Sequence, residues 1–461
     1  MYPTLLLLTG LVIAFGAFYA YRRTRDAFHP AIIVAPPLGF VYVVWPLLLN
    51  REGDLTWLIG TEGLVYVAAL YLGAVFAFYV GLLRLPGPRT LAYVRAQGRG
   101  AAESLFSIAL TPVMRRRIFY LAIGLGLIAL LAYVHMIMNV GGLVDAYSRA
   151  KGGGRAGSGY IGEAILLAFP AILLLAIARQ GLGRVRRSDI LIALLIASPH
   201  LLQGTLGGRR GPLFLVLAVL FFAWLIAHGR RPKLRTVVLA LVVIGMAVVV
   251  VQSQRQHLYL GSGAEFEAGR VTKILQPDTL EHNDYVAGVA TVLTRQFYGD
   301  YFWGGRYFIT VFVRPIPRQL WPTKYEDMAW MYEVVEHGGD WSEFRDALGF
   351  QPPRGAAVGF VADIYQEFAW GALLVVFLFG WGLAVLWKRH RLRGGVWTVV
   401  FIEAMILTIY IPTQSFSAFY HRFLFMAIIT ALVWRFWVNR GGSRAPIRSA
   451  PNGFQRPLRR Q

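Results

Sequence analysis

The sequence predicts an all-α protein, a polytopic transmembrane helical bundle of about eleven spans with a large helical loop on the extracytoplasmic side. Three observations predict it. Of the 461 residues, 56% are hydrophobic and 15% are charged, which is more apolar than one soluble core needs. Apolar runs of roughly 17 to 23 residues, enough to cross ~30 Å of hydrocarbon, recur along the chain. Basic residues gather in every second connection, as they do in cytoplasmic loops.

The first predicted span runs from Leu5 to Tyr21. It is followed rather than preceded by arginines, which is the reverse of a signal peptide, so we expect it to be retained. Between the eighth and ninth runs, residues 255–358 are the one segment long enough for a small domain, and their mixed aromatic and polar pattern predicts short helices at the membrane surface. The eleven runs centre near Gly10, Val41, Gly73, Ile128, Ala168, Ile196, Ala218, Ile244, Phe377, Met405 and Ile428.

Charge placement predicts the orientation of these spans. The connections at 22–25, 84–117, 179–187, 230–235, 388–393 and 435–461 contain 29 of the 46 Lys and Arg residues. We therefore expect them on the cytoplasmic side, with the N-terminus outside and the C-terminus inside. The same placement explains the net charge of +22 without nucleic acid as a partner. The predicted organisation is helices 1–8 over residues 1–254, the large extracytoplasmic loop over 255–358, helices 9–11 over 359–438 and a basic cytoplasmic tail over 439–461.

Basic residues on the outer side run against this bias and are candidates for binding an anion. A tight turn rich in glycine holds Arg209 and Arg210 between two spans, where an unpaired charge is costly. If the outer basic residues converge, they form a cationic pocket suited to a pyrophosphate; the competing interpretation is that each one snorkels to lipid headgroups. The candidates are Arg209, Arg210, Arg306, Arg314, Arg318, Lys324 and Arg422, with further basic residues at Arg149, Lys151, Arg155 and Arg255.

Acidic residues supply the second half of a possible site. Asp363 and Glu367 lie four residues apart, on one helical face, where the ninth apolar run begins. Either is a candidate general base, and the alternative is that one of them pairs with a loop arginine. Glu403, inside the tenth span, is a separate candidate that can also pair with a neighbour. The chain has no cysteine, which excludes thiolate chemistry, and no P-loop or H-E-x-x-H motif, so neither ATP nor a metal is expected.

Three segments carry a resemblance to a known family. The run YFWGGRYFITVFVRPIPRQLWPTK at 301–324 looks like a G-x-x-(Y/F)…(I/V)PR-x-x-W-P-x-K segment, and residues 356–385 look like a G-x-x-x-E-x-Y-x-x-F-G-x-x-G entry into the next span. The turn at 207–217 is similar to a Ser/Gly-Arg turn between two short spans. Segments of this kind are found in Wzy-type oligosaccharide repeat unit polymerases, also called O-antigen polymerases. The chain resembles this family. One departure is that Asp363 stands where that family has the glutamate of E-x-Y, and Glu367 follows one turn later.

The resemblance implies a membrane glycosyltransferase without a cofactor. It would polymerise undecaprenyl-pyrophosphate-linked repeat units of O-antigen or exopolysaccharide at the outer, periplasmic face of a bacterial plasma (inner) membrane. A hydroxyl of one lipid-linked glycan would attack the anomeric carbon of the other and release undecaprenyl pyrophosphate. Arginines would hold the pyrophosphate, and Asp363, Glu367 or His421 would be the base. The partners would be the donor and acceptor glycans, membrane lipids and a chain-length regulator protein.

Three alternatives remain open. An O-antigen ligase uses the same donor but transfers the glycan to lipid A core. A flippase or transporter of lipid-linked sugars should show internal repeats and charges along a path through the membrane, and neither is evident in the sequence. A metal-dependent transferase of the GT-C class would use the E-x-D pattern of Glu52 and Asp54 in the first outer loop.

Overall fold

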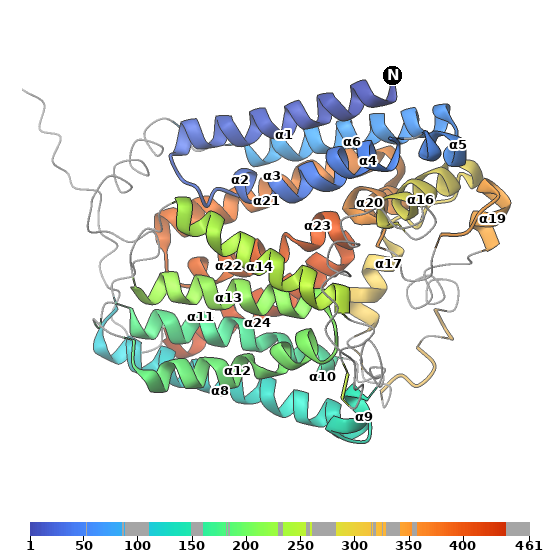
Figure 1. Ribbon diagram of the computed structural model, residues 1–461. Coiled ribbons are helices and arrows are strands. Elements are labelled where there is room, and N and C mark those ends of the chain that lie inside the picture. The colour runs from blue at the N-terminus through green and yellow to red at the C-terminus, as the bar shows by residue number, and fades with distance from the viewer. Residues whose placement is uncertain are drawn as a thin grey trace, which may run out of the picture.

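The computed structural model describes residues 1–51, 53–84, 87, 110–148, 160–180, 182, 185–228, 234–254, 259–260, 283–314, 316, 320–324, 326–328, 342–352 and 357–438. Every regular element in these ranges is helical, and the long helices lie side by side in one bundle (Figure 1). The prediction of an all-α bundle is therefore confirmed. Among the described residues, eight helices are long and apolar enough to cross a membrane: α1 (Tyr2–Thr24), α6 (Thr61–Leu82), α8 (Pro112–Asn139), Ile161–Arg179, α12 (Arg187–Thr205), α13 (Arg210–His228), Gly359–Arg393 and Phe416–Val438.

The other three predicted spans coincide with shorter apolar helices. Ala35–Leu49 joins α3 (Ala35–Gly39), the π-helix η1 (Phe40–Val44) and α4 (Trp45–Leu49). Val242–Val251 lies within α14 (Leu234–Gln254), and Val396–Pro412 joins α22 (Val396–Leu407) to α23 (Tyr410–Thr413). Ala35–Leu49 and Val396–Pro412 fall below the length of ~20 residues that a helix needs to cross the hydrocarbon unaided, whereas α14 has 21 residues.

Helix ends follow from local sequence signals. Thr111 begins α8, because its hydroxyl accepts a hydrogen bond of 3.2 Å from the backbone N–H of Met114 and Pro112 fits the first helical position. Ser415 begins α24 (Phe416–Val433) in the same way, since its hydroxyl accepts from the N–H of Ala418 at 3.1 Å. Both caps satisfy backbone donors that would otherwise be left without a partner at a helix start.

Glycines let two long helices, one from early and one from late in the chain, pack with their backbones in contact. A Cβ on Gly81 of α6 would lie 2.3 Å from the carbonyl oxygen of Phe377, and one on Gly380 of α21 (Ala372–Arg393) would lie 2.3 Å from that of Phe78. Helices that cross in a membrane commonly meet at such small residues. The pairing of α6 with α21 therefore depends on these two glycines.

Another group of helices surrounds α11 (Ala168–Arg179). Its residues from Ala168 to Ala178 are all buried. It packs against α8, α12, α13 and α22. At its start it continues into the 3₁₀-helix η2 (Ala164–Leu167) and the short α10 (Tyr160–Glu163). This continuation carries Glu163 to the end of the bundle, between the neighbouring helices.

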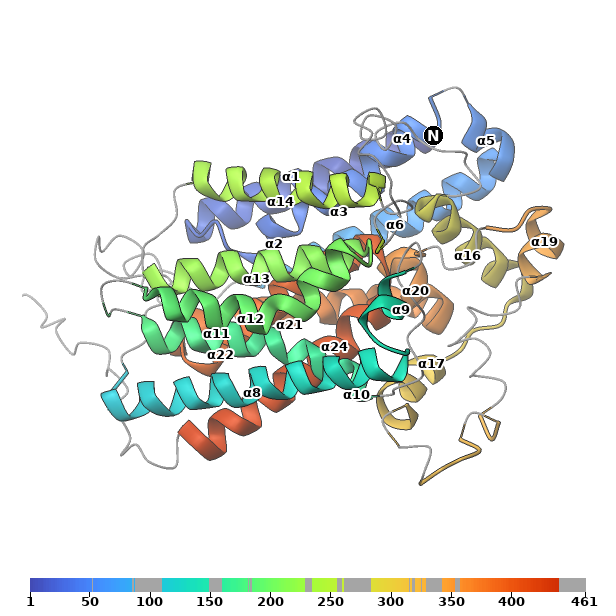
Figure 2. The ribbon, with the colours of Figure 1, turned by 60° about the horizontal axis from the view of Figure 1, so that its bottom comes forward.

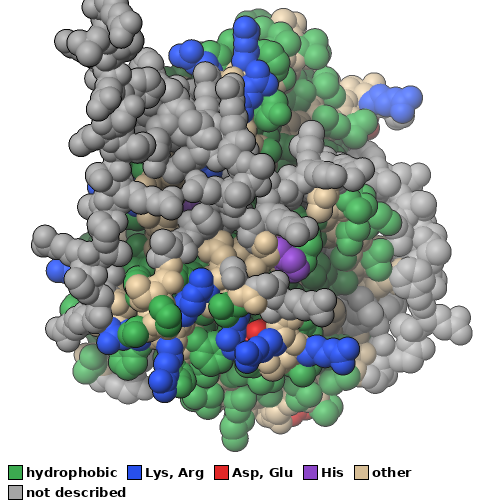
Figure 3. Space-filling view, turned by 90° about the vertical axis from the view of Figure 1, so that its left-hand side faces the viewer, with side chains coloured by type: hydrophobic (Ala, Val, Ile, Leu, Met, Phe, Trp, Pro, Cys, Tyr) green, Lys and Arg blue, Asp and Glu red, His purple; other side chains and the backbone are tan. Residues whose placement is uncertain are grey.

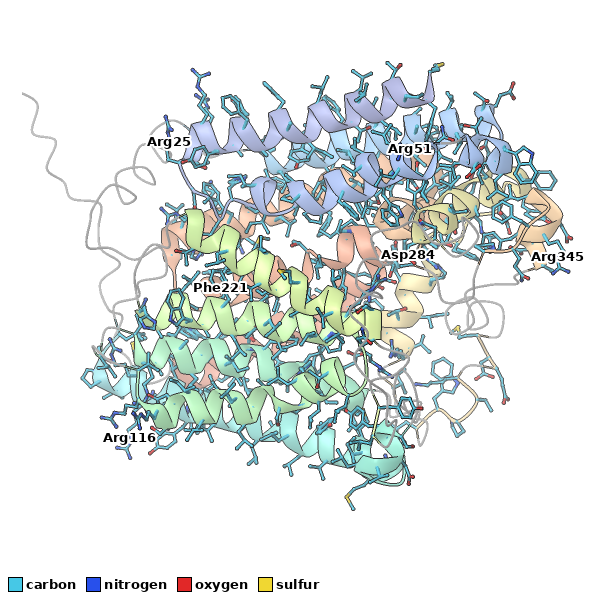
Figure 4. All side chains as sticks on the ribbon, viewed as in Figure 1. Arg25, Arg51, Arg116, Phe221, Asp284 and Arg345 are labelled. Atoms are coloured by element: carbon cyan, nitrogen blue, oxygen red, sulfur yellow. The ribbon has the colours of Figure 1, made fainter. Side chains whose placement is uncertain are left out.

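Basic side chains gather at one end of the bundle. Figure 4 places Arg25 and Arg116 at one end, and Arg51, Asp284 and Arg345 at the other. The first of these ends faces the viewer in Figure 3, where several Lys and Arg side chains lie on the part of the surface that the structure describes. Alternate connections therefore meet on one face, as the sequence predicts for cytoplasmic loops. The described basic residues of these connections are Arg22, Arg23, Arg25, Arg84, Arg115, Arg116, Arg117, Arg179, Arg186, Arg187, Lys388, Arg389, Arg391, Arg393 and Arg435.

Short helices build the opposite end: α5 (Asp54–Ile59), α9 (Leu143–Tyr147), α16 (Asp284–Tyr298), α17 (Gly305–Phe308), η4 (Ile309–Val313) and α19 (Ser342–Leu348) (Figures 1 and 2). The large loop thus contains short helices, as expected. α16 does not lie on the surface, however, because it packs against α20 (Gly359–Phe368) and α6, and its residues from Tyr285 to Val292 are buried. It forms part of the core at this end.

Candidate functional site

Asp363 and Glu367 both contact one arginine from the large loop. Their spacing puts them on one face of α20, and Arg306 of α17 reaches both. Nη2 of Arg306 lies 2.6 Å from Oδ1 of Asp363, and its Nε donates to Oε1 of Glu367. The two acids are 2% and 0% exposed. Although burial alone lowers the pKa of Arg306, Asp363 and Glu367 raise it above its ordinary value, so the guanidinium stays charged. The ion-pair alternative therefore accounts for both acids.

The remaining oxygens of the two acids bind neighbouring segments. Oδ2 of Asp363 accepts from the hydroxyl of Tyr307 and from the backbone N–H of Ser417, each at 3.0 Å. Oε2 of Glu367 accepts from the N–H of Gly304 at 2.8 Å. Buried carboxylates without such partners would be costly. The cluster of Arg306, Asp363 and Glu367, called here the Arg306 cluster, thus joins α17, α20 and the start of α24.

A cavity of about 490 Å³ lies at the same end of the bundle. It forms where α10, α12, α13, α23 and α24 meet, and polar side chains from all five elements reach it. Three arginines and one glutamate supply its charges. Its polar lining is Glu163, His200, Gln203, Arg209, Arg210, Tyr410, Gln414 and Arg422.

The three arginines of the cavity differ in their partners. Arg210 forms an ion pair of 3.0 Å with Asp284 of α16, and both side chains are 40% exposed. Nη1 of Arg422 donates to the carbonyl of Ala418 at 3.0 Å. The side chain of Arg209 makes no hydrogen bond or ion pair with any described residue, and burial lowers its pKa below the ordinary value. Arg209 is therefore the cation of the cavity whose charge is least compensated.

The turn between α12 and α13 fixes the positions of two of these arginines. Gly208 has a φ of +56°, in the left-handed region that a glycine adopts without strain. The backbone N–H groups of Gly208 and Arg209 donate back to the carbonyls of Thr205 and Gln203, and α13 begins at Arg210. The tight turn that the sequence predicts is present, and it places both arginines on the cavity wall.

Glu163 is the carboxylate of the cavity. It is 5% exposed, and its Oε1 lies 3.4 Å from Nη2 of Arg314 and 3.8 Å from Nε2 of His421. Nδ1 of His421 contacts the carbonyl oxygen of Ser417. A carbonyl only accepts, so Nδ1 carries the proton, and the lone pair of the neutral ring is on Nε2, facing Glu163. Nε2 of His421 and the carboxylate of Glu163 are therefore both acceptors in this state, and together they can hold one added proton.

The predicted residues fall into three groups. Arg209, Arg210 and Arg422 line the cavity, while Arg314 and His421 contact it through Glu163. Arg306, Lys324, Asp363 and Glu367 are not among its lining residues. Arg318, the basic residues Arg149, Lys151, Arg155 and Arg255, and Glu52 of the E-x-D pattern lie outside the described residues.

The side chain of Lys324 binds backbone carbonyls at the end of η4 and is not part of the cavity lining. It is 2% exposed, and its Nζ donates to the carbonyls of Val313 at 3.3 Å, Arg314 at 3.0 Å and Ile316 at 2.5 Å. These carbonyls lie at or just after the last residue of η4, where a cation also complements the helix dipole. The ammonium thereby fixes the backbone that carries Arg314.

Sequence reasoning overlooked Glu163 and Asp284. Glu163 could have been found from the sequence, because it is a lone carboxylate at the start of an apolar run, and such acids are candidates for a functional role. Asp284 carried no such signal, because only the folded chain brings it to Arg210. Glu403, which the sequence also singled out, accepts a hydrogen bond of 2.9 Å from Thr430 and lies away from the cavity lining.

Among the residues that the structure describes, no group of three or more His, Asp or Glu side chains is placed to hold a metal ion. Comparisons of the chain with protein-family models, with curated proteins and with solved structures find no match. A function for the protein therefore has to rest on the cavity and on the sequence segments described above.

Proposed function

We propose that the protein is a membrane glycosyltransferase that polymerises undecaprenyl-pyrophosphate-linked oligosaccharide repeat units at the outer face of a bacterial plasma membrane. The observation that carries this proposal is the cavity wall, where Arg209, Arg210 and Arg422 surround a space of about 490 Å³ beside Glu163. The cavity is at the end of the bundle opposite the basic face, which the positive-inside rule assigns to the cytoplasm. The resemblance to Wzy-type polymerases supports the same reaction.

The arginines suit a pyrophosphate leaving group. When the bond between the anomeric carbon and the pyrophosphate breaks, its electron pair leaves with the phosphate oxygen, where negative charge accumulates. Guanidinium groups fixed around that oxygen stabilise this charge more in the transition state than in the ground state. Arg209 is the best placed to do so, because none of the described carboxylates compensates it.

Glu163 and His421 suit the acceptor side of the reaction. As the acceptor hydroxyl attacks the anomeric carbon, its proton passes to the cavity-facing carboxylate of Glu163 and on to Nε2 of His421. The contact of 3.8 Å between these groups has to shorten for the second transfer, as catalytic hydrogen bonds commonly do when substrate binds. The resulting imidazolium remains next to Glu163 and Ser417, both of which accept hydrogen bonds from it.

The test compares Arg209→Lys and Arg209→Ala with wild type in membranes supplied with the lipid-linked repeat. Loss of a bidentate contact to the leaving group should cost ~2 to 4 kcal/mol, or roughly 30- to 1000-fold in the rate of polymer formation. Arg345→Ala, an exposed arginine at the same end of the bundle, is the matched control and should keep the wild-type rate (Figure 4). Wild-type ladders from both Arg209 variants would refute the assignment.

The same assay separates polymerase from ligase. In cells that lack the protein, a polymerase defect leaves single repeats on the lipid A acceptor, whereas a ligase defect leaves no repeat on it. If purified wild type transfers glycan only to lipid A core, the protein is a ligase that uses the same cavity.

A further inference from the structure

A second cluster of polar and aromatic side chains lies at the same end of the bundle as the cavity, and none of its residues lines the cavity. Five rings form it: Tyr66 of α6, Tyr301 and Trp303 before α17, Tyr365 of α20 and Trp370 after it. The ring centroids are 6.2 Å apart for Tyr301 and Trp303, 5.7 Å for Tyr301 and Tyr365, 6.5 Å for Tyr365 and Trp370, and 5.7 Å for Tyr66 and Trp370. The rings therefore form one continuous group, called here the aromatic platform.

The platform has an exposed surface and a hydrogen-bonding interior. Trp303 is 70% and Trp370 48% exposed, whereas Tyr365 is fully buried. The hydroxyl of Tyr365 lies 2.7 Å from that of Tyr66 and 3.2 Å from that of Tyr301. Three hydroxyl groups hold three hydrogens, and two bonds within the triad use two of them, so one remains for a partner outside it.

The backbone is in an unusual conformation at Trp303 and at the residue before Trp370. The described chain has three non-glycine residues with positive φ, and two of them are Trp303 at +49° and Ala369, next to Trp370, at +50°. Left-handed conformations are costly for bulky residues and persist only where the surroundings enforce them. The backbone N–H of Trp303 donates to the carbonyl of Glu367 at 2.7 Å, and Gly304 donates to the carboxylate of Glu367. The buried Arg306 cluster thus fixes the backbone that carries the exposed indole.

This fixed geometry argues against simple anchoring in lipid headgroups. A tryptophan at a membrane interface gains free energy by partitioning its ring into that region, and it needs no particular orientation. A stacking surface does need one, because the ring face has to meet a flat apolar face of a ligand. Strain kept at Trp303 and at Ala369, beside Trp370, is therefore better explained by a ligand with a defined shape.

We infer that the aromatic platform binds the carbohydrate of a lipid-linked repeat unit, with a sugar ring stacked on Trp303 or Trp370 and its hydroxyls paired with the tyrosine triad. Pyranose rings combine an apolar C–H face with hydroxyls that both donate and accept, and the platform offers the complementary groups. The inference rests on the proposed function for the identity of the sugar. It assigns the glycan to a subsite distinct from the pyrophosphate cavity.

A chain of contacts connects the two sites. Glu367 holds Trp303 and binds Arg306, and Arg306 binds Asp363. Asp363 accepts from the N–H of Ser417, whose carbonyl contacts His421 of the Glu163–His421 pair. The Arg306 cluster is therefore a positioning element that sets the platform relative to the cavity, which suits one substrate that carries a glycan and a pyrophosphate.

The test uses full-length protein in lipid nanodiscs and the lipid-free oligosaccharide released by mild acid from the lipid-linked repeats of the source membranes. Saturation-transfer NMR measures binding to wild type, Trp303→Ala and Trp370→Ala. We expect affinity to fall about 10-fold in each variant, as loss of an aromatic contact predicts. Trp303→Phe, which keeps a stacking ring, should recover most of it. Trp57→Ala is the matched control, because Trp57 is 87% exposed on α5 at the same end and is not one of the five rings.

Polymer formation in the same nanodiscs separates this inference from the proposed function. Wild-type affinity in both platform variants, or an equal loss in Trp57→Ala, overturns the platform whether or not wild type makes polymer. Binding that depends on Trp303 and Trp370 in a protein that makes no polymer supports the platform and refutes the polymerase. A wild type that neither binds the oligosaccharide nor polymerises refutes both.

Discussion

Replacing Arg306 by methionine removes the one cation, among the residues that the structure describes, that contacts Asp363 and Glu367. The change breaks the 2.6 Å contact to Asp363 and the contact to Glu367, and it leaves two carboxylates that are 2% and 0% exposed. Removing one partner of a buried ion pair costs ~3 to 5 kcal/mol, chiefly because the remaining charge has no compensation. That is a large part of a total stability of ~5 to 15 kcal/mol, so Arg306→Met should be strongly destabilised.

A triple variant tests whether charge is the cause. Arg306→Met combined with Asp363→Asn and Glu367→Gln removes all three charges at nearly constant volume. Because no buried charge is left unpaired, we expect it to recover more than half of the stability that the single variant loses. The matched control is Arg210→Met, whose ion pair with Asp284 is 40% exposed on both sides and should be worth ~0 to 1 kcal/mol.

Unfolding of the purified proteins in mixed micelles measures these differences as free energies. A triple variant as unstable as Arg306→Met would mean that packing rather than charge holds the cluster together. An Arg306→Met protein as stable as wild type would mean that the two acids have another cation as their partner, and it would remove the basis for the positioning role of the cluster.

Two further predictions concern the backbone and the topology. Ala369→Gly should stabilise the protein by about 1 kcal/mol in the same unfolding assay, because Ala369 has a φ of +50° and a ψ of −133° that glycine adopts without a Cβ clash; unchanged or lower stability would mean that this turn is not strained. The chain has no cysteine, so a single introduced thiol reports its side of the membrane. An impermeant maleimide should label Arg345→Cys but not Arg116→Cys in intact spheroplasts, since the two residues lie at opposite ends of the bundle, and the reverse pattern would invert the orientation (Figure 4).

Much of the scaffold could be predicted from sequence because its signals are local. Apolar run length predicted the long helices, and the spacing of arginines predicted that alternate connections share one face. The spacing of Asp363 and Glu367 predicted a common helical face, since residues four apart lie one above the other on a helix. The turn that holds Arg209 and Arg210 was also readable, because glycine on both sides leaves little room for a longer loop.

The tertiary structure alone decided which of these charges compensate one another. Arg306 lies 57 and 61 positions from Asp363 and Glu367, and Glu163 lies 151 positions from Arg314. At such separations no periodicity relates two side chains, and only the packing of α10, α17, α20 and α24 brings them within bonding distance. Electrostatic energy depends on distance and burial in space rather than on position in the chain. For that reason the sequence could name the candidate acids and cations, but only the fold could separate the buried ion pairs from the charges that line the cavity.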